Sequence, residues 1–444
     1  MPVFSIYKIG ASGVNVSKSP LQLANDELTA AQNAEFLIDP AIGGEGALSK
    51  RGGLATLTSA LAGDILGIHP LPLLTTYART LHAARGSENS NTFMTSTNGS
   101  TWTNTSTPTG HADGDKYTDE NNERDARRLA SFKNFLVYAG NNYTQDTDPP
   151  TVILWDGTAS VTAGNIGPGP TGNASPAFAI TDVLAANGKV YMAVHDPGGA
   201  APNLAGRVLQ YDPVTGKITQ VLNGFGGGTG EVAGGAPSAL AFYQGQLWVG
   251  LNTGNTTDAI GKIVRAYPDV DTTWTSDVAN LRQSISTLAV FKGDLYAGTQ
   301  SSASAGATIT RRSATTGTWT TQVTSAGGAS GNGHYASFLV DGATAIYAVE
   351  YHATTPIIHI LRSTDGTTWS TDRDVDANDG GITGNLPGSS IFYDDNDAFY
   401  FVFRATTTAG TNGFIMERSS GGVYTKRNAN TNMSGPIGVL VQRT

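Results

Sequence analysis

The chain has 444 residues, enough for about two or three ordinary domains or for one large repeat ring with an additional segment. It contains 55 glycines and no cysteine, 14% of its residues are charged, and its formal net charge is −9 at pH 7. The lack of cysteine excludes a disulfide framework and thiol chemistry, and the negative charge disfavours electrostatic binding of nucleic acid. Frequent threonine, valine and tyrosine, together with many glycines, favour an all-β class.

The segment 1–63 carries no copy of the repeat that fills the rest of the chain, and we expect it to form an N-terminal arm. A short helix is expected over 25–33, with Asn25 as its N-cap, and a strand over 35–38. The first residues lack the pattern of a signal peptide, and no window approaches the about 20 apolar residues of a membrane span. The arm has too few apolar residues for a core of its own. We therefore expect it to lie on the ring or on a partner.

A small set of apolar and basic side chains in this arm is expected to make its contacts. Ordering a glycine-rich segment costs about 1–2 kcal/mol per residue in backbone entropy, so another surface must cover these side chains. A strand of the arm can also add to an exposed sheet edge, which in a symmetric ring belongs to the next copy. The alternative is that the arm folds back on its own ring. The predicted interaction residues are Phe4, Tyr7, Leu28, Phe36, Leu37, Leu48, Lys50 and Arg51.

From residue 64 onward, a short apolar stretch followed by a tight turn and a second strand recurs seven times. The clearest copies are 240–250 and 288–298. Turn pairs such as Asn187-Gly188 accept the positive φ of a tight hairpin. Each copy closes with a strand end rich in threonine, glycine or aromatic residues, so each reads as an antiparallel meander of about four strands. A repeat of this length indicates a ring or an array of small sheets.

Small sheets of this kind bury both faces when they pack against their neighbours around an axis, as in a β-propeller. The sequence therefore predicts a seven-bladed β-propeller over 64–444, preceded by an N-terminal extended arm over 1–63. All tryptophans except Trp248 fall in the strand ends that close the copies of the repeat, and we expect them to fill the wedges between blades. The segment 435–442 reads as a strand whose pairing with the first blade would close the ring. A parallel solenoid, which would need a shorter period, is the alternative.

Two segments, 96–102 and 363–369, resemble the Asp-box of sialidases and related propellers, Ser-x-Asp-x-Gly-x-x-Trp, shortened by one residue. Asp365 supplies the acid in one segment, and Asn98 replaces it in the other. In that family the box is a turn device away from the active site, so the resemblance implies hydrogen bonds from these side chains to local backbone. The family's enzymes also need an arginine cluster and a Tyr/acid pair, and no such motif surrounds the arginines of this chain.

The remaining polar clusters show no motif of catalysis or metal binding. The acidic segment 372–379 alternates carboxylates as calcium loops do, but Ala377 stands where the sharp turn needs glycine, so a solvated loop between blades is favoured. The scattered histidines lack metal-ligand spacing, and the glycine-rich stretch 224–230 precedes no helix that would bind phosphate. We therefore predict no catalysis, no cofactor and no metal site.

One further pattern in the arm bears on function. It consists of Leu23, Asn25, Leu28, Thr29, Ala31, Asn33 and Phe36, followed by the ending Gly46-Ala-Leu-Ser-Lys-Arg-Gly-Gly53. In this pattern the arm resembles the beginning of many bacteriophage virion proteins, such as tail nozzle and related tail proteins. In those proteins proline usually precedes the last glycine of the pattern, whereas Gly52 precedes Gly53 here. The resemblance implies a structural tail protein, assembled in the host cytoplasm, whose partners are other virion proteins and copies of itself in a homo-oligomeric ring.

Two other functions stay open at the level of sequence. A propeller can recognise a host-surface glycan, which aromatic residues in clustered loops would favour, but the loops here are rich in glycine, threonine and asparagine. A glycosidase would need paired carboxylates in a central funnel. We expect neither sequence recognition of nucleic acid nor a membrane span.

Overall fold

A computed structural model of the chain divides it into two compact units, Met1–Tyr77 and Ala78–Thr444. All regular elements among the described residues are β-strands, so none of these residues forms a helix that is long and apolar enough to cross a membrane. The residues that the structure describes are 34–38, 46–50, 80–85, 92–98, 101, 103–105, 129–132, 135–139, 151–155, 160–165, 179–196, 205–225, 235–252, 261–282, 284–301, 306–325, 333–341, 344–352, 357–375, 385–393, 398–405, 414–427 and 437–443.

In the first unit, β1 (Ala34–Ile38) pairs antiparallel with β2 (Gly46–Lys50). Phe36 lies opposite Leu48 in this register. Among the described residues, each of the two strands pairs only with the other. The strand predicted over 35–38 is thereby confirmed, whereas the predicted helix and the predicted boundary at residue 63 lie outside the described part of the chain.

The strands of the second unit follow one another in sets of four, each an antiparallel meander. One set combines β30 (Ile437–Arg443) with β3 (Thr80–Arg85), β4 (Thr92–Ser96) and β5 (Thr103–Thr105). The next sets are β6 (Leu129–Phe132), β7 (Phe135–Ala139), β8 (Thr151–Trp155) and β9 (Ser160–Asn165), then β10 (Ala179–Ala186), β11 (Lys189–Asp196), β12 (Ala205–Asp212) and β13 (Lys217–Gln220).

Three further sets are joined edge to edge, through pairs such as Asn252 with Ser284, into one curved sheet. They are β14 (Ala236–Tyr243), β15 (Gln246–Asn252), β16 (Gly261–Ala266) and β17 (Thr275–Leu281), then β18 (Ser284–Phe291), β19 (Asp294–Ser301), β20 (Thr308–Arg312) and β21 (Trp319–Thr324), then β22 (Gly333–Asp341), β23 (Ala345–His352), β24 (Ile357–Ser363) and β25 (Ser370–Val375). The last set is β26 (Asn385–Tyr393), β27 (Ala398–Ala405), β28 (Phe414–Arg418) and β29 (Tyr424–Lys426).

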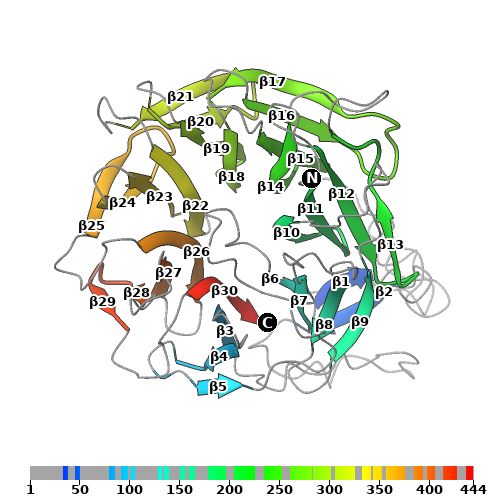
Figure 1. The fold of residues 1–444 in the computed structure, drawn as a ribbon, viewed down its shortest axis with the longest axis horizontal. Coiled ribbons are helices and arrows are strands. Elements are labelled where there is room, and N and C mark those ends of the chain that lie inside the picture. The colour runs from blue at the N-terminus through cyan, green and yellow to red at the C-terminus, as the bar shows by residue number, and fades with distance from the viewer. Residues whose placement is uncertain are drawn as a thin grey trace, which may run out of the picture. The chain divides into compact units, whose positions relative to one another are not determined.

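The first strands of successive sets lie against one another. β6 contacts β10, and the series continues through β14, β18, β22, β26 and β30, which in turn contacts β6. Within this unit, Figure 1 shows the first strand of each set near the middle and the fourth strand at the rim. The all-β class and the propeller-like arrangement that the sequence predicted are confirmed.

The expected pairing of the C-terminal strand is also confirmed. β30 pairs antiparallel with β3, so that Thr80 lies opposite Arg443 and Ala83 opposite Leu440. The first strand of this set is therefore supplied by residues at the other end of the unit. The expected start of the repeat, at residue 64, lies outside the described residues.

Tight turns connect the first and second strands of three successive sets. The turn residues are Asn187-Gly188, Gln244-Gly245 and Lys292-Gly293, and all six have φ between 50° and 83°. Two successive residues with positive φ match the twist of the flanking strands. The turn predicted at Asn187-Gly188 is confirmed.

A β-bulge in the innermost strand fastens each of three sets to the next. The bulged residues are Thr181, Ser238 and Ser286, where the strand register shifts. Their hydroxyls donate to backbone carbonyls in the next set: Thr181 Oγ1 to Pro237 at 2.8 Å, Ser238 Oγ to Ile285 at 2.5 Å, and Ser286 Oγ to Tyr335. Because a bulge re-aims one side chain, a short hydroxyl at this position can reach across the junction.

Apolar clusters fill the spaces between adjacent sets, and we name four of these interfaces. Interface A lies between β10–β13 and β14–β17, interface B between β14–β17 and β18–β21, interface C between β18–β21 and β22–β25, and interface D between β22–β25 and β26–β29. Trp274, Trp319 and Trp369 pack in A, B and C respectively, as predicted. Trp248, which the sequence analysis left aside, is buried in interface B as well.

Candidate functional site

Equivalent strand positions recur in several sets and carry much of the polar chemistry of interfaces A to D. In five sets the second strand holds a buried aromatic residue, and the third strand holds its cross-strand partner. The pairs are Tyr191 with Gln210, Trp248 with Arg265, Tyr296 with Arg311, Tyr347 with Arg362, and Tyr400 with Glu417. A bulge in the fourth strand adds a third residue, which is Asp277, Gln322 or Asp372.

In interface B, this bulge carries a buried carboxylate. Asp277 Oδ1 accepts a hydrogen bond from Arg265 Nε at 3.0 Å. Asp277 Oδ2 accepts from Arg312 Nε at 2.9 Å and from Trp319 Nε1 at 2.6 Å, both on the next set. The two guanidinium groups lie over the ring of Trp248, 5.5 and 4.8 Å from its centroid. One carboxylate thus links two sets and satisfies three donors, which offsets the cost of burying it.

Interface D repeats the arrangement with different aromatic residues. Asp372 Oδ2 accepts from Arg418 Nε at 2.7 Å and from the Tyr424 hydroxyl at 2.6 Å. Arg418 lies over Tyr347, 5.3 Å from its ring centroid, and Arg362 Nε donates to the Tyr347 hydroxyl at 3.1 Å. Burial, together with the neighbouring carboxylate, raises the pKa of Tyr424 far above its ordinary value.

This geometry corrects the interpretation of the acidic segment 372–379 as a solvated loop. Its first four residues belong to β25, and Asp372 is the bulge residue of that strand, held at the interface by Arg418. Asp374 pairs with a histidine of the neighbouring strand. The carboxylates at 372 and 374 therefore belong to an outer strand, while 376–379 lie outside the described residues.

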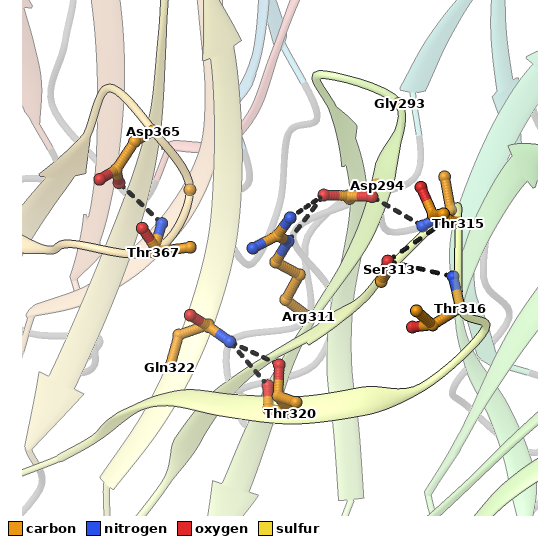
Figure 2. Close-up of polar contacts among 12 residues, drawn as sticks. Gly293, Asp294, Arg311, Ser313, Thr315, Thr316, Thr320, Gln322, Asp365 and Thr367 are labelled. Atoms are coloured by element: carbon orange, nitrogen blue, oxygen red, sulfur yellow. Dashed lines mark hydrogen bonds and ion pairs between the residues drawn. The ribbon is translucent and has the colours of Figure 1, made fainter.

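Interface C has a glutamine where B and D have the carboxylate (Figure 2). Gln322 Nε2 bonds back to its own strand, to Thr320 O at 3.1 Å and Thr320 Oγ1 at 2.7 Å. Arg311 turns instead toward Asp294, to which its Nε donates at 2.7 Å. The buried indole nitrogen of Trp369 consequently has no hydrogen-bond partner among the described residues.

The turn after β24 behaves as a local backbone device, as the sequence analysis predicted. Asp365 Oδ1 accepts the amides of Thr368 at 2.7 Å and Thr367 at 2.8 Å. These backbone bonds hold the pKa of the Asp365 carboxyl well below its usual range. Asn98 substitutes for the acid in the turn after β4, where its Oδ1 accepts the amide of Thr101 at 2.8 Å.

The two strand sets that meet at interface A each carry exposed apolar side chains on a turn, and an ion pair joins the two sets. Lys189 Nζ lies 2.6 Å from Asp269 Oδ1 and joins the start of β11 to the turn between β16 and β17. Val270 is 78% exposed, Val214 72% and Tyr267 44%, and they make up three of the five large hydrophobic residues exposed in the described part of the chain. We call Lys189, Val214, Tyr267, Asp269 and Val270 the interface A corner.

Polar atoms in the interior of interface A remain unsatisfied. The Tyr191 hydroxyl and Gln210 Oε1 are buried and have no hydrogen-bond partner among the described residues. Burial and, second, the charge of Asp269 raise the pKa of Tyr191 to about 12.

A row of four polar side chains crosses the β22–β25 set and was missed by the sequence analysis. Tyr335, Glu350, His359 and Asp374 are successive cross-strand partners, and the first two are buried. His359 Nδ1 lies 2.6 Å from Asp374 Oδ1, so the carboxylate fixes the orientation of the imidazole. In the described part of the chain, no group of three or more His, Cys, Asp or Glu could hold a metal ion. The register of four neighbouring strands brings these residues together, and their spacing in the sequence does not predict that register.

Half of the predicted interaction residues fall in the arm hairpin. Phe36 and Leu37 belong to β1, and Leu48 and Lys50 to β2, with Leu37 opposite Ala47. The other four, Phe4, Tyr7, Leu28 and Arg51, lie outside the described residues. Their role in assembly stays a prediction.

Comparison with known proteins identifies the fold alone. No protein family model matches the chain, and no curated protein matches its sequence. Among solved structures, a protein from Lactobacillus plantarum is similar at a TM-score of 0.54 and 12% identity, over 82% of this chain and 98% of that one. A putative 6-phosphogluconolactonase from Bacteroides uniformis is similar at a TM-score of 0.52 and 12% identity, over 82% and 99% of the two chains.

Proposed function

We propose that the chain is a structural component of a bacteriophage virion, a nozzle, tube or tip protein of the tail. Its N-terminal arm, 1–63, and the loops of its ring bind neighbouring copies and other virion proteins, and the chain itself has no enzymatic activity. The ring, 64–444, is a seven-bladed β-propeller in this proposal. Seven sets of four strands, whose first strands contact one another in a closed series, support that number of blades.

The arm hairpin is the observation that carries the proposal. It belongs to a compact unit separate from the propeller-like one, and its two strands pair only with each other among the described residues. A two-stranded hairpin alone is at best marginally stable in water, so it needs a third strand or another surface. The resemblance of the arm to virion tail proteins indicates that a neighbouring subunit supplies that surface.

The interfaces between strand sets suit a rigid platform. Asp277 and Asp372 each link two sets through arginine and an aromatic donor. Glu417 accepts two hydrogen bonds from Arg427, both at 2.8 Å. These charges are engaged in holding the structure together, which supports a structural role.

Deletion of residues 2–54 tests the proposal. We expect the remaining chain to keep its β-sheet circular dichroism and its cooperative unfolding, because β3–β30 lie outside the deleted segment. Incorporation into the particle is expected to fail. A full-length variant with Val423→Ala, changed at an exposed turn of the propeller-like unit, serves as the control. Normal incorporation of the truncated chain would contradict the proposal, and so would glycoside turnover that is lost in Glu350→Gln.

A further inference from the structure

The interface A corner is built from turns that hold their own conformation. The amide of Val214 donates to Asp212 Oδ1 at 2.8 Å. The amide of Tyr267 donates to Asp271 Oδ2 at 2.8 Å, and that of Val270 donates to Tyr267 O at 3.1 Å. Apolar side chains on rigid turns lose little conformational entropy when a partner covers them. The corner is therefore prepared to bind a ligand without reorganisation.

The charges around this corner favour a basic partner. Three carboxylates, Asp212, Asp269 and Asp271, lie on its turns, and Lys189 and Lys217 oppose them, so that the local formal charge is 2 − 3 = −1. Lys189 is already bound to Asp269. A segment that combines apolar side chains with positive charge complements such a surface.

The arm carries a segment of that description. Residues 46–54 read Gly-Ala-Leu-Ser-Lys-Arg-Gly-Gly-Leu, with two cations, Lys50 and Arg51, between the apolar residues Leu48 and Leu54. Its first five residues form β2. The segment has no acidic residue, so it carries a formal charge of +2 against the −1 of the corner.

We propose that the interface A corner of one copy binds residues 46–54 of the arm of a second copy. Leu48 packs on Val270, and Lys50 and Arg51 face the carboxylates of the two turns. The inference rests on the proposed function, because it names the surface through which the arm joins subunits. A single contact of this size is weak, but in a ring of copies each contact makes the next one intramolecular, so that together they bind tightly.

Cysteine cross-linking between copies tests this docking site directly, since the chain contains no cysteine of its own. Full-length Leu48→Cys is mixed with full-length Val270→Cys under mild oxidation, and the yield of the mixed covalent dimer is measured. Val423→Cys replaces Val270→Cys in the control, because Val423 is 64% exposed on the turn between β28 and β29. We expect a yield at least about tenfold above the control, and equal yields would overturn the proposal.

Two further measurements complete the test. The double variant Leu48→Cys/Val270→Cys, oxidised at high dilution, shows whether the link forms within one chain, and a link that forms only there would overturn the assignment to a second copy. In analytical ultracentrifugation, Val270→Ser should weaken self-association at least about tenfold, because the variant removes apolar contact area without adding charge, whereas Val423→Ser should leave it unchanged. Equal weakening by both variants would count against the proposal.

The outcomes separate this inference from the proposed function. If cross-linking fails while incorporation into the particle still requires residues 2–54, the docking site is wrong and the virion role stands. If the truncated chain is incorporated normally, the virion role of the arm is wrong, whatever the cross-linking shows.

Discussion

Interfaces B and C use the same strand positions, but only in B do the polar groups at those positions all have hydrogen-bond partners among the described residues. In B the bulge of the fourth strand presents Asp277, which accepts from two arginines and from Trp319. In C the bulge presents Gln322, which folds back onto its own strand, and the indole nitrogen of Trp369 has no partner among the described residues. A single bulge residue therefore decides whether a buried carboxylate links the two sets.

Interface D shows that the arrangement in B is a repeated one. Asp372 stands at the bulge, Arg418 comes from the next set, and Tyr424 takes the place of Trp319 as the aromatic donor. The donor changes from an indole to a phenol, while the carboxylate and the arginine are kept. Interface C is thus the exception among these three, and its difference from B can be measured.

Removal of the bulge carboxylate should have the largest effect. Asp277→Ala leaves Arg265, Arg312 and the Trp319 N–H without their shared acceptor, so we expect the free energy of unfolding to fall by about 3–5 kcal/mol. Gln322→Ala, at the equivalent position of interface C, should change it by no more than about 0.5 kcal/mol. Chemical denaturation measures both variants, and equal losses would contradict the comparison.

A methyl group added at the turn before Trp369 should disturb interface C by sterics. Gly366 has φ of +76°, and an added Cβ would collide with the Tyr296 hydroxyl. Gly188 is the control, because its φ is +73° but nothing lies within 4 Å of the added atom. Gly188→Ala should cost about 1–2 kcal/mol from its backbone alone, and Gly366→Ala about 1–3 kcal/mol more from overpacking. Similar thermal stabilities of the two variants would show that interface C accommodates the added methyl group without loss of stability.

Replacement of the two tryptophans by phenylalanine isolates the hydrogen bond. Trp319→Phe removes a donor at 2.6 Å from Asp277 and leaves a buried carboxylate with one bond fewer, whereas Trp369→Phe removes a donor that has no partner among the described residues. Both variants lose similar apolar area. We expect Trp319→Phe to be the more destabilising by about 1–3 kcal/mol, and the reverse order in urea denaturation would contradict this.

Alkaline pH should weaken interfaces A and C through the tyrosines of their second strands. Burial raises the pKa of Tyr191 and of Tyr296 to about 12, whereas an unfolded tyrosine titrates near pH 10. Between these values the unfolded chain has released a proton that the folded chain keeps, so the free energy of unfolding falls as pH rises from about 10 to 12. Interface B has Trp248 at this position, which does not titrate, so its contribution comes instead from Tyr243, whose pKa burial raises. Tyr296→Phe should reduce the slope of stability against pH, and an unchanged slope would argue against this assignment.

Much of the fold was accessible from the sequence because its signals are local. Alternating apolar residues around Asn187-Gly188 predicted a hairpin, and the apolar run 435–442 predicted the strand that pairs with β3. The tryptophans at strand ends predicted the packing between sets. Each of these inferences needed only residues close together in the chain.

The interface clusters were not accessible in this way. A bulge interrupts the alternation of sides, so the direction of Asp277 or Asp372 cannot be read from its place in a strand. Their partners Arg312 and Arg418 come from another set, 35 and 46 residues further along the chain. The corner at interface A was missed because the sequence does not show whether a single valine such as Val270, between Asp269 and Asp271, is exposed or buried.

The pairing of β30 with β3 has a consequence for the time course of synthesis. Thr80 is translated 443 − 80 = 363 residues before its partner Arg443. At about 5–20 residues per second, the ribosome needs about 20–70 seconds to bridge that distance. Throughout this interval the edge of β3 that will receive β30 has no partner, and an open strand edge is a template for pairing with other chains. When several ribosomes translate one messenger RNA, neighbouring nascent chains therefore expose unpaired β3 edges that can pair with one another and aggregate. This risk ends for each chain when β30 emerges from the ribosome and pairs with β3.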